Sequence, residues 1–405
     1  MTTYRTVGLM SGTSLDGVDA ALCRVTLPDP GEPLVETEIE REAFYADEYE
    51  SAFRDYLRSV CTEDAGLEAL ARAEVAVGRR FARSVAGVLE AAGVESDAVD
   101  LIGSHGQTVW HAPTSEQLPA GLGRTRATLQ IGDPSVIARE TGIDTVADFR
   151  RADIAAGGHG APLSPLLDWL QFGGDEDRIV QNVGGIGNCT VLPGAGTRGE
   201  ISAFDTGPGN MVIDAAVYAL TDGERRFDEG GRMAAAGTVD GELLAALLED
   251  PYFDREPPKS TGREAYGDEY AAGLLERAAD RDLSAEDTVA TATALTSASI
   301  ADAYDRHVDL EPERVIVSGG GAWNETLLAD LDARVACPVE SSRDRGVDPD
   351  SREAVLFALL AALFDARKPG SLPSVTGARA PAVLGTVARA PSKNEGDRVS
   401  SPSKG

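Results

Sequence analysis

The chain opens on a strand, a glycine-containing turn and a second strand, and this feature limits the available folds more than any other. Residues 7–10 and 20–22 are apolar runs, and Gly12, Asp16, Gly17 and Asp19 lie between them. This pattern predicts a tight β-hairpin. Backbone N–H groups and hydroxyls at such a turn can converge on an anion, and Asp16 or Asp19 could hold Mg²⁺ beside it. Ordinary Asp-Gly turn chemistry explains the segment equally well.

The second half of the chain repeats this opening. Residues 178–192 predict a strand, a turn containing Gly184 and Gly185, and another strand, while residues 314–318 predict a buried strand that runs into Gly319, Gly320 and Gly321. No P-loop motif occurs, and no dinucleotide fingerprint follows a strand. Two glycine hairpins, one opening each half, predict two related α/β domains that face a shared cleft.

Periodicity predicts further elements around these turns. Helices are expected at 67–92, from 134 to 140, at 290–304 and at 353–364. Short strands are expected at 99–103, before Asp133 and at 143–148, with a loop at 104–111.

The charge balance is strongly acidic, with 67 Asp and Glu against 37 Lys and Arg and a net charge of −30. Only Lys259, Lys368, Lys393 and Lys404 are lysines. The acidic surplus is spread along the chain, which favours a surface adapted to high salt, and it argues against a nucleic-acid partner. The four scattered cysteines indicate neither a zinc site nor a disulfide framework. No apolar run could span a membrane and no signal peptide is evident, so we expect a cytoplasmic protein.

A series of segments, in order along the chain, closely resembles the anhydro-N-acetylmuramic acid kinases of the actin, sugar-kinase and heat-shock-ATPase superfamily. The matching segments are residues 8–22, 104–111, 129–133, 147–158, 182–186, 204–211, 257–264, 319–321 and 372–378. The resemblance implies two actin-like, ribonuclease H-like α/β domains with mixed sheets flanking a central ATP and sugar cleft. It implies a first domain at 1–143, completed by 370–389, and a second at 144–369. The Pro-, Ser- and Lys-containing composition of residues 390–405 predicts a disordered tail.

The family's activity implies an ATP-dependent kinase that phosphorylates the 6-oxygen of 1,6-anhydro-N-acetylmuramic acid. Water opens the anhydro ring in the same reaction, which gives N-acetylmuramic acid 6-phosphate and ADP. The resemblance assigns the catalytic base to Asp205, in Phe-Asp-Thr-Gly-Pro-Gly-Asn at 204–210. It also implies ATP and Mg²⁺ as cofactors, a small sugar substrate and a homodimer, with no nucleic acid and no membrane.

The resemblance also implies two sets of binding residues. The ATP set is Gly12, Thr13, Ser14, Leu15, Asp16, Gly17, Val18, Asp19, Asn182, Gly184 and Gly185, with Gly319, Gly320 and Gly321 on the adenosine side, and Asp16 is expected to hold Mg²⁺ through water. The sugar set is His105, Gln107, Asp133, Asp148, Arg150, Asp153 and Glu353.

Several of these residues have structural alternatives. Asp205 could cap a turn before Gly-Pro, and its Asp-Thr-Gly occurs once, whereas an aspartic-protease dyad needs two copies. Asp148, Arg150 and Asp153 could form a salt-bridged turn, and Glu353 could simply favour the start of a helix. Lys259 could face solvent or the cleft.

The chain departs from the family pattern at His159, where Gln is usual, and at Gly187, where Ala is usual. The first change could alter a substrate contact. Three functional alternatives remain open: a kinase for another anhydro or amino sugar, an ordinary sugar kinase that uses a free hydroxyl, and a non-catalytic ATP-binding switch.

Overall fold

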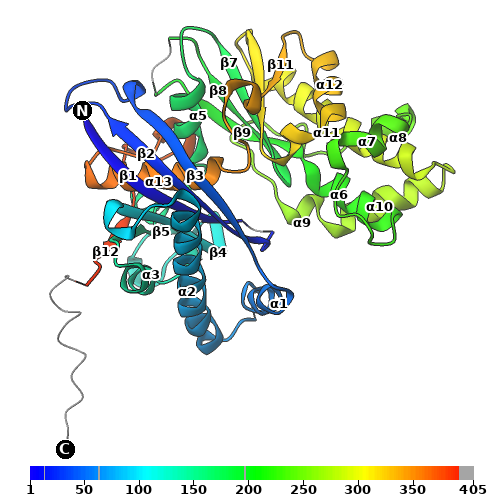
Figure 1. Ribbon diagram of the computed structural model, residues 1–405. Helices are drawn as coiled ribbons and strands as arrows, with labels where there is room; N and C mark the ends of the chain where they lie inside the picture. The colour runs from blue at the N-terminus through cyan, green and yellow to red at the C-terminus, as the bar shows by residue number, and fades with distance from the viewer. Residues whose placement is uncertain (13, 63, 196–197, 392–405) are drawn as a thin grey trace, which may run out of the picture. The chain divides into compact units, whose positions relative to one another are not determined.

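The computed structural model describes residues 1–12, 14–62, 64–195 and 198–391 (Figure 1). Thr13 and most of the predicted tail, residues 392–405, lie outside this description. The chain divides into two compact units, residues 1–170 with 351–405 and residues 171–350.

The first unit contains a mixed sheet in the order β12-β6-β4-β1-β2-β3, with β5 paired to β4. Its central strand β1 runs parallel to β4, where Thr6 lies opposite Leu101, and antiparallel to β2, where Met10 lies opposite Asp19. The strands are β1 (Thr2–Ser11), β2 (Gly17–Leu27), β3 (Glu38–Glu48), β4 (Leu101–Gln117), β5 (Arg124–Ile131), β6 (Thr145–Ala147) and β12 (Thr386–Ala388).

The second unit repeats this topology in the order β11-β10-β7-β8-β9. Here β7 is the central strand, antiparallel to β8 and parallel to β10, as β1 is to β2 and β4. The strands are β7 (Arg178–Val183), β8 (Ile186–Leu192), β9 (Ser202–Pro208), β10 (Arg314–Ser318) and β11 (Val339–Ser341). The predicted fold class, α/β with mixed ribonuclease H-like sheets, is therefore confirmed.

Helices cover both faces of the first sheet because successive strand residues point to opposite sides. Val7 and Leu9 of β1 pack in one core cluster with Phe81 of α2 (Leu67–Ala92). Gly8, between them, faces α13 (Arg352–Asp365), where an added Cβ would lie 1.8 Å from the carbonyl oxygen of Ala354. The remaining helices of this unit are α1 (Ser51–Val60), α3 (Pro134–Thr141), α4 (Arg151–Ala155), α5 (Ser164–Phe172, which reaches into the second unit) and α14 (Pro373–Thr376).

The second unit is built around α11 (Ala285–His307), a long helix whose middle is buried on all sides. Its small Ala, Thr and Ser side chains allow neighbouring elements to approach closely. The other helices are α6 (Asn210–Leu220), α7 (Arg232–Ala236), α8 (Gly241–Leu247), α9 (Arg263–Tyr266), α10 (Asp268–Ala279) and α12 (Glu325–Arg334). Among the described residues, no helix is both long and apolar enough to cross a membrane.

The unit boundaries lie at 170/171 and 350/351, whereas the sequence predicted 143/144 and 369/370. The difference has two causes. Strand β6 pairs with β4 and therefore stays in the first sheet, and α13 packs on the same sheet at Gly8. A buried ion pair between Arg352 of α13 and Asp168 of α5 joins the segments next to the two boundaries.

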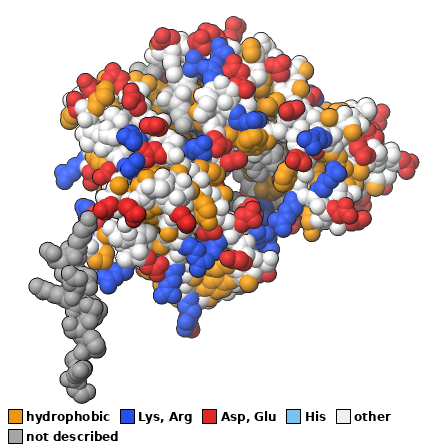
Figure 2. All heavy atoms as spheres, viewed as in Figure 1, with side chains coloured by type: hydrophobic (Ala, Val, Ile, Leu, Met, Phe, Trp, Pro, Cys, Tyr) orange, Lys and Arg blue, Asp and Glu red, His pale blue; other side chains and the backbone are white. Residues whose placement is uncertain are grey.

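Most predicted elements are present, including the helix at 67–92 with its bounds unchanged. The predicted loop at 104–111 is instead part of β4, and Asp205 lies inside β9 rather than in the turn before Gly-Pro-Gly. Figure 2 shows acidic side chains scattered over the visible face among Lys and Arg side chains, not gathered in one patch.

Candidate functional site

The first hairpin forms as predicted, and its loop at residues 12–16 joins two strands near their buried ends. Ser14 and Asp16 are exposed, and a Cβ added to Gly12 would have only Ser14 Oγ within 4 Å, at 3.6 Å. Leu15 and Val18 are instead buried in the core, so their side chains cannot contact a nucleotide. The space beside Gly12 is therefore open.

Gln107 of β4 holds this loop from within the sheet. Its Nε2 donates to the carbonyl oxygen of Gly12 at 3.1 Å, and its Oε1 lies 2.7 Å from Ser11 Oγ. Ser11 Oγ also lies 2.8 Å from the Gly17 carbonyl oxygen and 3.1 Å from the Tyr49 hydroxyl. Gln107, which the resemblance placed in the sugar set, is fully buried, and both polar atoms of its amide support this loop.

The second hairpin and the three glycines lie side by side, because β7 and β10 are parallel neighbours with Asn182 opposite Ser318. Gly319 has φ 73°, and a Cβ there would lie 2.5 Å from Asn182 Oδ1. A Cβ on Gly321 would lie 2.5 Å from Cβ of Val183. Both positions require glycine, so the predicted adenosine and second phosphate residues form one surface of the second unit.

The start of α6 closes this surface. The backbone N–H of Asn210 donates to the Gly184 carbonyl at 2.7 Å, and its side-chain Nδ2 donates to the Val183 carbonyl at 3.1 Å. The N–H groups of Gly209 and Met211 both donate to the Gly185 carbonyl. The hairpin loop is therefore fixed before any ligand arrives.

Asp205 lies on β9, next to a bulge at which Gly187 opposes Gly207 and Asn188 opposes Asp205. Burial raises the pKa of Asp205 to about 6, although the Thr261 N–H donates to its Oδ2 at 2.9 Å and opposes that shift. A carboxylate with this pKa is half ionised near pH 6 and can accept a proton near neutrality.

His105, Arg150 and Glu353 form a polar group in the first unit. Arg150 Nε donates to His105 Nε2 at 3.0 Å, so Nδ1 carries the proton and donates to the Gly106 carbonyl at 2.9 Å. Burial and the charge of Arg150 hold the pKa of His105 far below its usual range, so this imidazole is neutral. Arg150 also interacts electrostatically with the exposed Glu353.

Two carboxylates of the predicted sugar set have structural partners instead. Asp133 caps α3 by accepting from the Ser135 N–H at 2.8 Å. Asp153 is fully buried, with one oxygen bonded to the Gly160 N–H and the other to Thr376 Oγ1. These contacts give both carboxylates hydrogen-bond partners within the fold.

Two other positions can be placed in the same way. Asp148, in the left-handed region with φ 60°, pairs with Arg151 at 2.9 Å and so partly matches the alternative of a salt-bridged turn. His159 donates from Nδ1 to the Thr376 carbonyl at 2.7 Å, which ties its loop to the last residue of α14.

A small polar cavity of about 140 Å³ lies within the first unit. It is lined by His105 and Asp148 of the predicted sugar set and by Glu74, Ser104 and Arg151. The Ser104 hydroxyl is buried and has no hydrogen-bond partner among the described residues. Sequence reasoning missed Glu74, because it lies on α2 far from every motif.

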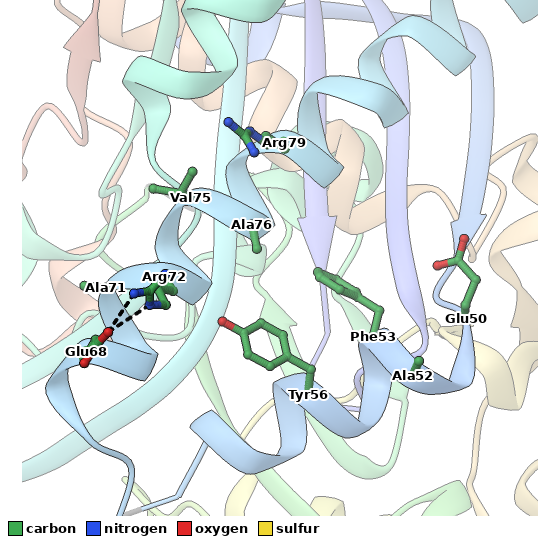
Figure 3. Close-up of a pocket in the computed structure, with 10 residues that line it drawn as sticks. All are labelled: Glu50, Ala52, Phe53, Tyr56, Glu68, Ala71, Arg72, Val75, Ala76 and Arg79. Carbon is green, nitrogen blue, oxygen red and sulfur yellow. Dashed lines mark hydrogen bonds and ion pairs between the residues drawn. The ribbon is translucent and has the colours of Figure 1, made fainter.

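A groove of about 1000 Å³ lies between α1 and α2 (Figure 3). Phe53 and Tyr56 project from α1 toward Val75 and Ala76 of α2, and Arg72 pairs with Glu68 at its edge. None of the predicted site residues lines it. Volume alone therefore does not identify the site.

Over the part of the chain that the structure describes, no group of three or more His, Cys, Asp or Glu could hold a metal ion. A metal that needs a complete protein cage does not fit these residues. A single exposed carboxylate such as Asp16 suits Mg²⁺, which commonly takes one or two carboxylates together with phosphate and water oxygens.

Comparison with known proteins gives a consistent result. A family profile described as "Anhydro-N-acetylmuramic acid kinase" matches residues 4–390. A protein of that name from Salinibacter ruber is 47% identical over 386 residues, covering 94% of this chain and 95% of the relative. Another from Caldanaerobacter subterraneus subsp. tengcongensis is 41% identical over 387 residues, covering 94% and 96%.

Solved structures are more distant. The Acidaminococcus fermentans (R)-2-hydroxyglutaryl-CoA dehydratase component A is 13% identical, with a TM-score of 0.45, covering 90% of this chain and 99% of that one. A ROK family glucokinase from Streptomyces griseus, in complex with glucose and AMPPNP, is also 13% identical, with a TM-score of 0.38 and coverage of 88% and 99%. These likenesses carry no argument about activity.

Proposed function

The chain belongs to the anhydro-N-acetylmuramic acid kinase family, and from that premise we propose that it transfers the γ-phosphoryl group of ATP to the 6-oxygen of 1,6-anhydro-N-acetylmuramic acid. The family predicted from the sequence motifs is thereby confirmed. The enzyme is a phosphotransferase with an alcohol group as acceptor. The observation that carries the proposal is the match over residues 4–390.

The reaction balances with one water molecule. The oxygen of water bonds to the anomeric carbon, the bond between that carbon and the 6-oxygen breaks, and the 6-oxygen takes the γ-phosphoryl group. ADP leaves, and the products are ADP and N-acetylmuramic acid 6-phosphate.

Asp205 is the residue we assign as base for the attacking water. Its carboxylate is partly buried, its backbone is held within β9, and its pKa of about 6 leaves it ionised at neutral pH. A carboxylate with an ordinary pKa would be a weaker base, so burial increases its proton affinity without protonating it at pH 7.

ATP is assigned to the loop at 12–17 with Asp19, and to Asn182, Gly184, Gly185 and Gly319 to Gly321. The open space at Gly12 and the enforced glycines at 319 and 321 support this assignment, since phosphates and ribose need close backbone approach. The buried side chains of Leu15 and Val18 restrict those two residues to backbone contacts. Asp16 is the residue we expect to hold Mg²⁺ through water, and Mg²⁺ would neutralise charge on the phosphates when bound.

Sugar contacts are assigned to Arg150 and Glu353, whose opposite charges suit hydroxyl and carboxylate groups of an amino sugar. His105 positions Arg150 through the bond at 3.0 Å. His105 also lines the small polar cavity together with Asp148, so this cavity adjoins the Arg150 side chain. The family resemblance also implies a homodimer, which we include in the proposal. Light scattering, which measures the molar mass in solution, tests it.

The decisive assay combines the protein, Mg-ATP and anhydro-N-acetylmuramic acid in molar salt, with ¹⁸O-labelled water. We expect ADP, a 6-phosphosugar and the label on the anomeric carbon. A phosphosugar without label indicates an ordinary sugar kinase, and turnover only with another anhydro sugar changes the substrate. ATP binding without any sugar-dependent turnover supports the alternative of a non-catalytic ATP-binding switch.

The role of Asp205 is tested by Asp205→Asn. Turnover should fall by roughly 10²- to 10⁴-fold, the usual range for a general base, while calorimetry still detects ATP binding. Asp309→Asn, an exposed position on the same unit, is the matched control and should be fully active. Full activity of Asp205→Asn would remove the assigned base.

A further inference from the structure

Asp205 is held at three points by a segment that lies some fifty residues further along the chain. Its backbone N–H donates to the Lys259 carbonyl at 3.2 Å, and its own carbonyl accepts from the Tyr252 hydroxyl at 2.8 Å. The Thr261 N–H donates to its Oδ2 at 2.9 Å. Both backbone polar groups and one carboxylate oxygen are therefore occupied.

Lys259 closes this arrangement into a ring. Its ammonium lies 5.1 Å from the centre of the Tyr252 ring, where a cation is attracted to the π face. The same ammonium lies 3.5 Å from the Phe253 carbonyl and 3.3 Å from His307 Nε2. Lys259 is 7% exposed, although it is one of four lysines in a chain that otherwise uses arginine.

We propose that Tyr252, Lys259 and the Thr261 N–H are positioning groups for Asp205, which fix Oδ2 so that Oδ1 is the atom that takes the proton from water. This inference rests on the proposed function, because it assumes that Asp205 is the base. It adds which oxygen acts and which residues keep it in place.

The geometry supports a one-sided base. Among the described residues, Oδ1 has no hydrogen-bond partner, whereas Oδ2 has the Thr261 N–H. A carboxylate bonded through one oxygen cannot rotate freely about its terminal torsion. Since a base works only within hydrogen-bond reach of the proton it removes, this restraint keeps Oδ1 aimed at one water position.

The charges that face Asp205 act in opposite directions. Lys259 lowers the pKa of its carboxyl group, and Glu264 of α9 raises it. Tyr252 is neutral, because burial raises the pKa of its hydroxyl above its usual range. On α11, Asp302 raises the pKa of Lys259 against the lowering effect of burial, and His307 Nε2 lies 3.3 Å from the Lys259 ammonium. The donor to Oδ2 and the Lys259 charge are thus the groups that favour the ionised base.

Thr261→Pro removes the N–H that bonds Oδ2, and Thr261→Ala keeps it. For Thr261→Pro we expect kcat to fall by about tenfold or more, KM for both substrates to stay within about threefold, and the acid limb of the pH profile to move up by about one unit. Thr261→Ala keeps this donor, so its acid limb should stay where it is in the wild type. A lower kcat together with a raised KM, and an acid limb at the wild-type pH, would overturn the proposal.

Tyr252→Phe is the second variant and does not touch the backbone. Tyr266→Phe is its control, since the Tyr266 hydroxyl is buried in the neighbouring aromatic cluster without a hydrogen-bond partner among the described residues. We expect kcat to drop severalfold only in Tyr252→Phe, with KM unchanged. Equal activity of both variants would contradict the role of Tyr252.

An NMR titration separates this inference from the proposed function. In protein labelled with ¹³C at aspartate carboxyls, the Asp205 signal is the one missing from Asp205→Asn. The pKa of Asp205 should rise in Thr261→Pro and in Lys259→Met. In Lys259→Arg, which keeps the positive charge, it should equal the wild-type value. If the wild type turns over no anhydro sugar, the proposed function fails while this titration still decides whether the groups act on Asp205.

Discussion

At the scale of single residues, Asp205 differs from the exposed acidic side chains that dominate this protein. Strand β9 and the segment that contains Tyr252 and Lys259 shield its carboxyl group from water. The resulting desolvation raises the pKa more than the Thr261 hydrogen bond lowers it. The balance is a pKa of about 6. A position on the sequence cannot reveal such a balance, because the opposing groups come from distant segments.

The pH dependence of turnover follows from this pKa. The base must be ionised, so kcat/KM should be constant well above pH 6 and fall about tenfold per unit below it. The measurement is the initial rate from pH 4.5 to 8.5 at constant molar salt. An acid limb near the ordinary value of an aspartate would show that burial does not tune the base.

The same burial affects stability with the opposite sign. A carboxyl whose pKa is higher in the folded than in the unfolded state favours folding when protonated, and this contribution is lost as the pH rises through about 6. Asp205→Asn should therefore raise the thermal midpoint above pH 6 and leave it nearly unchanged near pH 4. Differential scanning calorimetry at both pH values checks this, and a lower midpoint at pH 8 would contradict it.

At the scale of elements, the first hairpin depends on a residue outside it. Gln107→Leu keeps the side-chain volume close but leaves Ser11 Oγ and the Gly12 carbonyl without their partner. We expect ATP affinity to fall about tenfold, since lost hydrogen bonds of this kind cost about 1 kcal/mol or more. Gln117→Leu, exposed on the same strand, is the control for calorimetric titration with ATP. Equal affinities would show that Gln107 does not shape the loop.

The contact between β1 and α13 leaves no room for a side chain at Gly8. Gly8→Ala would drive its Cβ into the Ala354 carbonyl, so the helix must move away from the sheet. Overpacking of this kind typically costs 1–3 kcal/mol, and about the same or more is expected here. Gly273→Ala lies in α10 with open space around it and should be neutral or stabilising. Thermal unfolding compares the two, and an unchanged Gly8→Ala would mean that the helix yields freely.

At the scale of the whole molecule, a net charge of −30 acts on stability through salt. The Debye length falls from about 10 Å at 0.1 M to about 3 Å at 1 M, which screens repulsion among scattered carboxylates. We expect the thermal midpoint to rise by about 10 °C or more between 0.1 and 2 M KCl. Surface ion pairs also weaken between 0.1 and 2 M KCl. A falling thermal midpoint would therefore show that attraction within these pairs outweighs repulsion among the carboxylates, and that the chain is not adapted to high salt.

Prediction from sequence succeeded where the signal is local. The helix at 67–92 repeats apolar residues on one face, and both hairpins carry glycine turns between apolar runs. Strand β3 had no such signal, because as an edge strand it carries charged residues on much of its length. The hydrogen-bond partners of Asp133 and Asp153 could not be predicted, because they depend on which backbone and side-chain groups fold against each carboxylate.

The sequence by itself determined the family, the two glycine hairpins, the three glycines after β10 and Asp205 as the candidate base. Each of these features can be recognised from a short run of residues that are neighbours in the sequence. Only the tertiary structure decided that Gln107 supports the first loop, that α13 belongs to the first unit and that Tyr252, Lys259 and Thr261 hold Asp205. These facts depend on which distant segments meet and on which polar groups lose water there, and neither is a property of local sequence.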